Sequence, residues 1–268
     1  MPLWFAALLG LVQGLSEFLP ISSTAHLRLI PALLGRPDPG AAFTAVIQLG
    51  TLIAVIVYFA RELAKMARAV VVDRAAKEAR LAWLIILGTL PIGIAGVAAK
   101  PFITGDARSL WVVAVALIVV AIVMWFTDRE ARQDRTIASL GLVDAVIIGT
   151  AQACALIPGV SRSGATIVAA LLVGLSRADG ARFSFLLSIP AIAAAGLFEA
   201  PDAFRELGSS ALGPLAVATV VAGVSGYASI AWLISFLATR TLAGLVIYRL
   251  AVGLLILGLL TTGVLTAR

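Results

Sequence analysis

Residues 109–127 form the stretch SLWVVAVALIVVAIVMWFT, which contains no charged side chain. A helix that crosses the hydrocarbon core of a membrane needs about 20 consecutive apolar residues, because each residue advances the helix by about 1.5 Å. Five further stretches of comparable length and apolarity lie along the chain, at 41–60, 80–98, 183–198, 214–236 and 243–265. The sequence therefore predicts an all-α polytopic membrane protein with six transmembrane helices.

The composition excludes an ordinary soluble fold. Hydrophobic residues make up 61% of the 268 residues and charged residues 13%, with a mean hydropathy of +1.08. Soluble domains are about 45–50% apolar and about 25% charged. The sequence lacks the alternation of polar and apolar residues that is typical of a membrane β-barrel, so we expect a helical bundle that forms one integral membrane domain over residues 1–268.

The excess of positive charge indicates a membrane orientation rather than a nucleic-acid partner. The net charge is +6, and the Lys and Arg residues lie in short loops between apolar runs. Short loops rich in Lys and Arg face the cytoplasm, and the loop 61–80 contains six such residues. Counting spans outward from this loop places both termini and the loop 35–40 outside the cell. We expect no nucleic acid as a partner.

Two further apolar stretches, residues 2–34 and 140–175, are interrupted in the middle by Pro, Ser, Thr and charged residues. Each half is too short to span a bilayer. Both stretches therefore predict re-entrant helix-loop-helix hairpins. The topology has the first hairpin entering from the outer face and the second from the inner face, so that their tips meet near the midplane of the membrane.

A weak internal repeat supports this arrangement. Residues 22–26, SSTAH, align with residues 162–166, RSGAT, at an offset of 140 residues, and Phe43-Thr44 aligns with Phe183-Ser184 at the same offset. The aligned spans run in opposite directions in the predicted topology, which indicates inverted repeats of approximately 1–135 and 136–268. Inverted repeats with broken helices place polar sites at the midplane of many transporters, so the architecture alone leaves enzyme and transporter open.

The first hairpin contains most of the residues that can do chemistry. Gln13 and Glu17 are four residues apart and therefore lie on one face of a helix. A carboxylate at membrane depth costs about 2.5–3.5 kcal/mol on insertion scales, so it is usually partnered and functional. Hydroxyls and the only histidine of the chain follow a proline, at Ser22, Ser23, Thr24 and His26. A purely structural role as helix caps is the alternative for the hydroxyls.

The second hairpin contains PGVSRSGAT at residues 158–166. Its glycines allow close approach of the backbone, and the guanidinium of Arg162 can bind phosphate through two parallel hydrogen bonds at a helix start. An arginine that snorkels to the cytoplasmic interface is the alternative. Together, the two tips would present a carboxylate, an imidazole, hydroxyls and an arginine, which suits phosphoryl transfer. A carboxylate repels a diphosphate unless a divalent metal ion, Mg²⁺ or Ca²⁺, lies between them.

These two motifs resemble those of the undecaprenyl-diphosphate phosphatases, also called bacitracin-resistance proteins. The first family pattern, [E/Q]-x-x-x-E followed by F-L-P-x-S-S-T-x-H, matches residues 13–26, and the second, P-G-x-S-R-S-x-x-T, matches residues 158–166. The resemblance implies hydrolysis of undecaprenyl diphosphate, which recycles the lipid carrier of cell-wall synthesis in the bacterial inner membrane. It also implies an inverted repeat with two re-entrant hairpins.

Position by position, the resemblance assigns roles to the matched residues. It implies Glu17 and Gln13 as the metal-associated pair, Ser23 and His26 as the hydroxyl and imidazole of the centre, and Arg162 as the phosphate-binding residue. The remaining hydroxyls line the site, namely Ser22, Thr24, Ser161, Ser163 and Thr166. Many relatives have a second glutamate where this chain has Gln13, so its metal affinity is expected to be weaker.

The sequence leaves the chemical step and one rival function open. Ser23 attacks phosphorus with His26 as general base, or His26 is itself the nucleophile, or His26 activates water. The rival function is a transporter or flippase of polyprenyl phosphate. The substrate is expected to enter from the outer, periplasmic face, and its chain needs an apolar groove open to lipid. Small residues in 222–228 permit a homodimer, although packing inside one bundle is the favoured interpretation.

Overall fold

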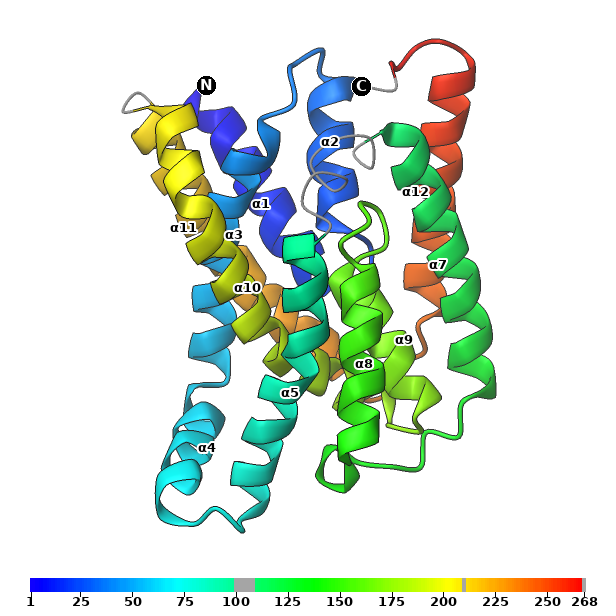
Figure 1. Cartoon of the computed structure of the whole chain (residues 1–268). Coiled ribbons are helices and arrows are strands. Elements are labelled where there is room, and N and C mark those ends of the chain that lie inside the picture. Colours follow the sequence, from blue (N-terminus) through cyan, green and yellow to red (C-terminus); the bar gives the residue numbers. More distant parts are fainter. Residues whose placement is uncertain (99–108, 209–210, 267–268) are drawn as a thin grey trace.

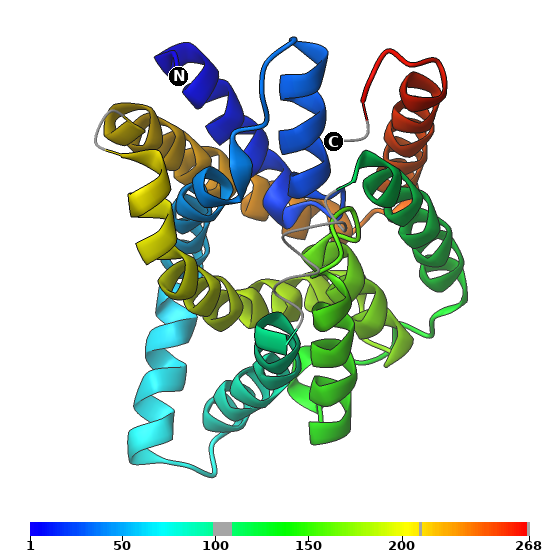
Figure 2. The ribbon, with the colours of Figure 1, turned by 45° about the horizontal axis from the view of Figure 1, so that its top comes forward.

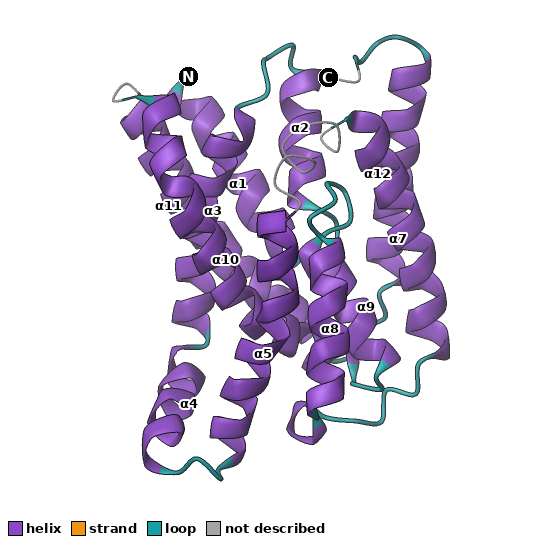
Figure 3. Ribbon diagram, viewed as in Figure 1, coloured by secondary structure: helices purple, strands orange, loops and turns teal. Residues whose placement is uncertain are grey.

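The computed structural model describes residues 1–98, 109–208 and 211–266. Within these ranges the chain forms eleven α-helices and one short 3₁₀ helix, and no strand (Figure 3). Six of the helices contain segments long and apolar enough to cross a membrane, as the sequence predicts. These segments are Gly40–Tyr58 (α3), Lys77–Ala98 (α5), Leu110–Glu130 (α7), Arg177–Leu197 (within α10), Leu212–Leu237 (α11) and Ala243–Thr261 (α12).

The two interrupted stretches form helix-loop-helix pairs. The first consists of α1 (Leu3–Phe18) and α2 (Ser23–Leu33), and the second of α8 (Leu142–Cys154) and α9 (Arg162–Leu172). From their connecting turn, α1 and α2 extend toward the top of Figure 1, whereas α8 and α9 extend from theirs toward the bottom. The two turns meet in the middle of the molecule.

Two boundaries differ from the sequence prediction. The charged segment 61–80 was expected to be a loop, but it contains the helix α4 (Ala60–Val72), whose Met66 is buried against the core. The span expected at 183–198 belongs to a longer helix, α10 (Arg177–Leu207), which begins after the capping side chain of Ser176 and continues beyond its expected end through a charged segment. In both places charge was taken as the end of a helix, although a helix outside the apolar core tolerates it.

Close packing of helices fixes the positions of the hairpins. Helix α1 packs on α11, α11 packs on α3, α5 packs on α8, and α7 packs on α12 at one side of the molecule in both views (Figures 1 and 2). A Cβ atom added at Gly14 of α1 would lie 2.5 Å from the carbonyl oxygen of Ala222 on α11, and one added at Gly149 of α8 would lie 2.1 Å from that of Gly88 on α5. Glycine at these positions therefore allows the hairpins to approach the longer helices.

Candidate active site

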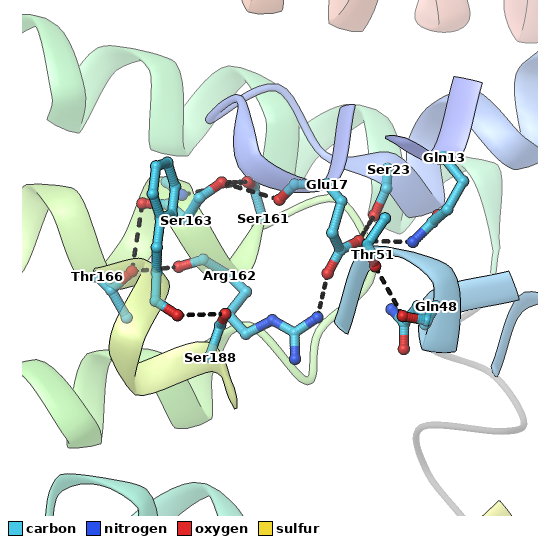
Figure 4. A network of polar contacts seen from close by, with 12 residues as sticks. Gln13, Glu17, Ser23, Gln48, Thr51, Ser161, Arg162, Ser163, Thr166 and Ser188 are labelled. Carbon is cyan, nitrogen blue, oxygen red and sulfur yellow. Dashed lines mark hydrogen bonds and ion pairs between the residues drawn. The ribbon is translucent and has the colours of Figure 1, made fainter. Parts of the chain in front are cut away.

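The tips of the two hairpins contact each other directly (Figure 4). The hydroxyl of Ser163, in the first turn of α9, donates to the carbonyl oxygen of Leu19 at 3.0 Å. Arg162, the first residue of α9, forms an ion pair with Glu17 near the end of α1. The structure thus joins residues that are 145 positions apart in the sequence.

Each tip contains a serine in an unusual backbone conformation. Ser22 and Ser161, the residues immediately before α2 and α9, both have a φ of 73°. A non-glycine residue in this region costs about 1–3 kcal/mol and persists only where the surroundings enforce it. The strained residue turns the chain sharply, so that the first residues of α2 and α9, Ser23 and Arg162, face the contact between the tips.

A buried arginine, Arg249 of α12, holds the two tips together. Its side chain is fully buried, and its guanidinium donates hydrogen bonds to backbone carbonyls of both tips and of α7. The acceptors are Pro20 at 2.8 Å, Gly159 at 3.0 Å, Val160 at 3.1 Å and Leu117 at 3.3 Å. The sequence analysis did not single out Arg249, although an arginine within an apolar span is a signal of function or of a specific partner.

Glu17 is the centre of the polar network. Its Oε2 accepts a hydrogen bond from Gln13 Nε2 at 2.9 Å and another from Ser23 Oγ at 2.7 Å, while its Oε1 accepts from Arg162. Figure 4 shows Glu17 between Arg162 on one side and Ser23 and Gln13 on the other. The predicted facing of Gln13 and Glu17 is confirmed, and a buried carboxylate is compensated by one cation and two neutral donors.

The structure does not bring His26 together with Ser23. The Nδ1 of His26 lies 2.8 Å from the backbone oxygen of Ser22, and Nε2 lies 2.7 Å from the hydroxyl of Tyr248. A carbonyl oxygen only accepts hydrogen bonds, so Nδ1 holds a proton, and in the neutral imidazole Nε2 accepts from Tyr248. The two rings are also stacked, with an interplanar angle of 5°. Both ring nitrogens of His26 are therefore engaged in holding the first tip.

The hydroxyls of the second hairpin mostly serve its own structure. Ser161 Oγ accepts from the backbone N–H of Gly164 at 3.2 Å and caps α9. Thr166 is fully buried, and its hydroxyl donates to the backbone oxygen of Arg162 at 2.8 Å and lies 2.5 Å from that of Ser184. The substrate contacts predicted for Ser163 and Thr166 stay a prediction; in the structure both hydroxyls bond to the protein itself.

A cavity of about 470 Å³ opens beside the junction of the tips. Its polar end contains Glu17, Ser22, Ser23, Thr24, Ser161 and Arg162. Most of the remaining wall comes from α3, α5 and α10, with further residues from α2, the loop before α3 and the turn between α8 and α9. This part is largely apolar, with Ile92 and Val97 among the lining residues. The cavity therefore combines an anion-binding end with an apolar wall, as an amphiphilic phosphate ester requires.

The residues around Glu17 fit a divalent metal ion with few protein ligands. Within the described parts of the chain, no cluster of three or more His, Cys, Asp or Glu side chains exists. However, the Oε1 atom of Gln13 is buried without a hydrogen-bond partner and belongs to the side chain that contacts Glu17. Mg²⁺ commonly binds one or two protein oxygens together with water and substrate phosphates, and a neutral amide oxygen is an acceptable ligand for Ca²⁺.

The six candidate membrane helices define a polytopic membrane protein. Its candidate site combines a serine, a carboxylate and an arginine, namely Ser23, Glu17 and Arg162, and is of the phosphoryl-transfer type. Residues 6–255 match the family model described as bacitracin resistance protein BacA. The chain belongs to this family.

Curated relatives are similar in sequence to this chain over nearly its whole length. An undecaprenyl-diphosphatase of Myxococcus xanthus is 50% identical over 272 residues, covering 99% of this chain and 92% of the relative. Relatives of the same name from a Nocardioides species and from Gloeobacter violaceus are 48% and 49% identical, covering 98% and 97% of this chain and 98% and 92% of their own lengths.

Proposed function

We propose that this protein hydrolyses undecaprenyl diphosphate to undecaprenyl phosphate and inorganic phosphate, as the names of its relatives indicate for them. The observation that supports this most directly is the hydrogen bond of 2.7 Å from Ser23 to Glu17, beside Arg162 and at the polar end of the cavity. It supplies a nucleophile, a proton acceptor and a cation in one place, which a carrier does not need.

The arrangement favours Ser23 as the nucleophile and Glu17 as its base. Ser23 Oγ attacks the terminal phosphorus, its proton passes to Glu17 Oε2, and the bond from that phosphorus to the bridging oxygen breaks. Undecaprenyl phosphate leaves with the electron pair of that bond. Arg162 offsets the negative charge that develops on the phosphoryl oxygens. Water then hydrolyses the phosphoserine and releases inorganic phosphate. His26, which contacts Ser22 and Tyr248, supports the tip in this scheme.

A divalent metal ion, Mg²⁺ or Ca²⁺, would be held by Glu17 and by the Oε1 of Gln13. When bound, the ion supplies positive charge next to a substrate that is itself highly negative. Glu17 and Gln13 orient each other through their hydrogen bond of 2.9 Å, so the two ligands are arranged as a pair before an ion arrives.

The placement in the membrane follows from the hairpins. In the proposed topology, α1–α2 and α8–α9 are re-entrant hairpins of an inverted repeat within a single domain in the bacterial inner membrane. Helices α2 and α9 have 11 residues each and follow serines of equal φ that are 139 residues apart, one fewer than the offset in the sequence alignment. In this topology the active site opens toward the periplasm, because the basic segment 61–80 is placed on the cytoplasmic side.

Three of the small residues of 222–228 are not available to a homodimer. Ala222, Gly223 and Gly226 pack within the chain against α1 and α3, as the sequence analysis favoured. The rest of the bundle's outer surface is available to lipid or to a second copy.

The test is phosphate release from farnesyl diphosphate by the purified protein, with and without a chelator. Ser23→Ala, Glu17→Gln and Arg162→Ala are each expected to lower kcat by at least about 100-fold. Phosphate trapped on Ser23 by rapid quench would support the serine mechanism, and phosphate trapped on His26 would contradict it. Binding of lipid without phosphate release by the wild type would contradict the phosphatase, and transport of intact polyprenyl phosphate would then favour the carrier.

A further inference from the structure

A second arginine lies in the wall of the active-site cavity. Arg28 is on α2, five residues after Ser23, and its side chain is only 10% exposed. Five residues correspond to about 7.5 Å along a helix axis. Because Ser23 and Arg28 both line the cavity but at different points along α2, Arg28 is placed for a group attached to the terminal phosphate rather than for that phosphate itself.

Arg28 forms an ion pair with a carboxylate that remains partly hydrated. Its Nε lies 3.3 Å from Oδ2 of Asp38, whose side chain is 32% exposed. The other oxygen of Asp38 accepts from the backbone N–H of Gly40 at 3.0 Å, at the start of α3. By contrast, Glu17, the partner of Arg162, is 4% exposed. A hydrated carboxylate gives up its partner at lower cost than a buried one, so the Arg28–Asp38 pair is the easier of the two to exchange.

The charges in the cavity wall favour the exchange of a carboxylate for a phosphate as the partner of an arginine. Among the described lining residues, Arg28 is paired with Asp38 and Arg162 is paired with Glu17. A diphosphate entering this cavity gains attraction only if an arginine leaves its carboxylate for the phosphate, or if a cation enters as well. Guanidinium groups bind phosphate oxygens through paired, charge-assisted hydrogen bonds.

We propose that Arg28 binds the phosphate that stays on the lipid, exchanging Asp38 for this phosphate, while Ser23 and Arg162 hold the terminal phosphate. The assignment rests on the proposed function, because it takes the terminal phosphate to lie at Ser23. It makes Arg28 a binding residue for the product lipid phosphate and Asp38 its competitor in the empty site.

The two halves of the ion pair are expected to change substrate affinity in opposite directions. Arg28→Gln should raise the KM for farnesyl diphosphate about tenfold, because it removes one group that forms charge-assisted hydrogen bonds; the change in kcat should be smaller. Asp38→Asn keeps the acceptor for Gly40 but removes the competing charge, and it should lower KM. Farnesyl monophosphate should inhibit Arg28→Gln more weakly and Asp38→Asn more strongly than wild type, whereas inhibition by inorganic phosphate should not change.

Arg36→Gln is the matched control. Arg36 follows the C-terminal end of α2 and contacts the rings of Trp4 and Phe5, so its loss changes the local charge without touching the cavity. Its KM should equal that of wild type. If Arg28→Gln does not fold, Arg28→Lys and Asp38→Asn test the same exchange.

If Arg28→Gln and Asp38→Asn shift KM in the same direction by the same factor, the ion pair is structural and the proposal is overturned. An unchanged KM in both variants would overturn it as well. A change in inhibition by inorganic phosphate alone would overturn the assignment to the lipid-side phosphate. Failure of the phosphatase function itself is separate, because wild type would then release no phosphate in the same assay.

Discussion

Replacing Arg249 by methionine is expected to separate the tips of the two hairpins. The side chain is fully buried, and its guanidinium connects the first tip to the second through backbone carbonyls. Methionine has a similar length but no donor, so the carbonyl oxygens of Pro20, Gly159 and Val160 lose the hydrogen bonds that Arg249 donates.

The expected loss follows from those acceptors. A buried acceptor that loses its donor costs about 1–3 kcal/mol, so three tip carbonyls with partial relaxation give a loss of about 3–5 kcal/mol. For a chain of this size, the loss lowers the melting temperature by about 10 °C. Activity should fall at least about 100-fold, because Arg162 and Glu17 lie on opposite tips and a displacement of about 1 Å can cost that much.

The assay combines thermal unfolding in detergent, followed by tryptophan fluorescence, with phosphate release from farnesyl diphosphate. Arg249→Lys should be intermediate, since its donors share one nitrogen and cannot span carbonyls on both tips. Arg240→Met is the control, because Arg240 is an exposed arginine just before α12. An Arg249→Met protein that has the melting temperature of the wild type and releases phosphate from farnesyl diphosphate at the same rate would refute the reasoning.

Three further perturbations test other parts of the structure. Tyr248→Phe removes the donor to His26 and should cost about 1 kcal/mol of stability; a loss of kcat above tenfold in steady-state assays would instead indicate chemistry at the imidazole. Arg135 lowers the pKa of the Asp144 carboxyl through a hydrogen bond, so Asp144→Asn should melt earlier than wild type at pH 7, and this difference should shrink as pH falls below about 3.9. Gly149→Ala should melt earlier because its Cβ would meet a carbonyl oxygen of α5 at 2.1 Å.

The membrane helices could be predicted because apolar length is a local property of the sequence. Residues 109–127 and 214–236 were expected as spans, and α7 and α11 cover them. The errors arose where charge was taken as the end of a helix. In α4, charged side chains occupy the outer face while Met66 packs inward, a pattern that a search for apolar spans overlooks.

The site could be predicted only in part, because its geometry combines local and distant contacts. The spacing of Gln13 and Glu17 was enough to predict that they face each other. The family resemblance implied Ser23 and His26 as the hydroxyl and imidazole of the centre and left the nucleophile open. In the structure the imidazole contacts Ser22 and Tyr248, which lies 222 positions away from it. Such a partner cannot be found from local spacing.

The two arginines of the cavity are neutralised in the same way. Each is held by a carboxylate in the structure, Arg162 by Glu17 and Arg28 by Asp38. An unpaired guanidinium in a largely apolar cavity would be costly, so these pairs stabilise the protein before substrate arrives. Substrate then competes with carboxylates rather than with water. Affinity for the diphosphate should therefore depend on how readily each carboxylate is released, and the more hydrated Asp38 should be exchanged before the buried Glu17.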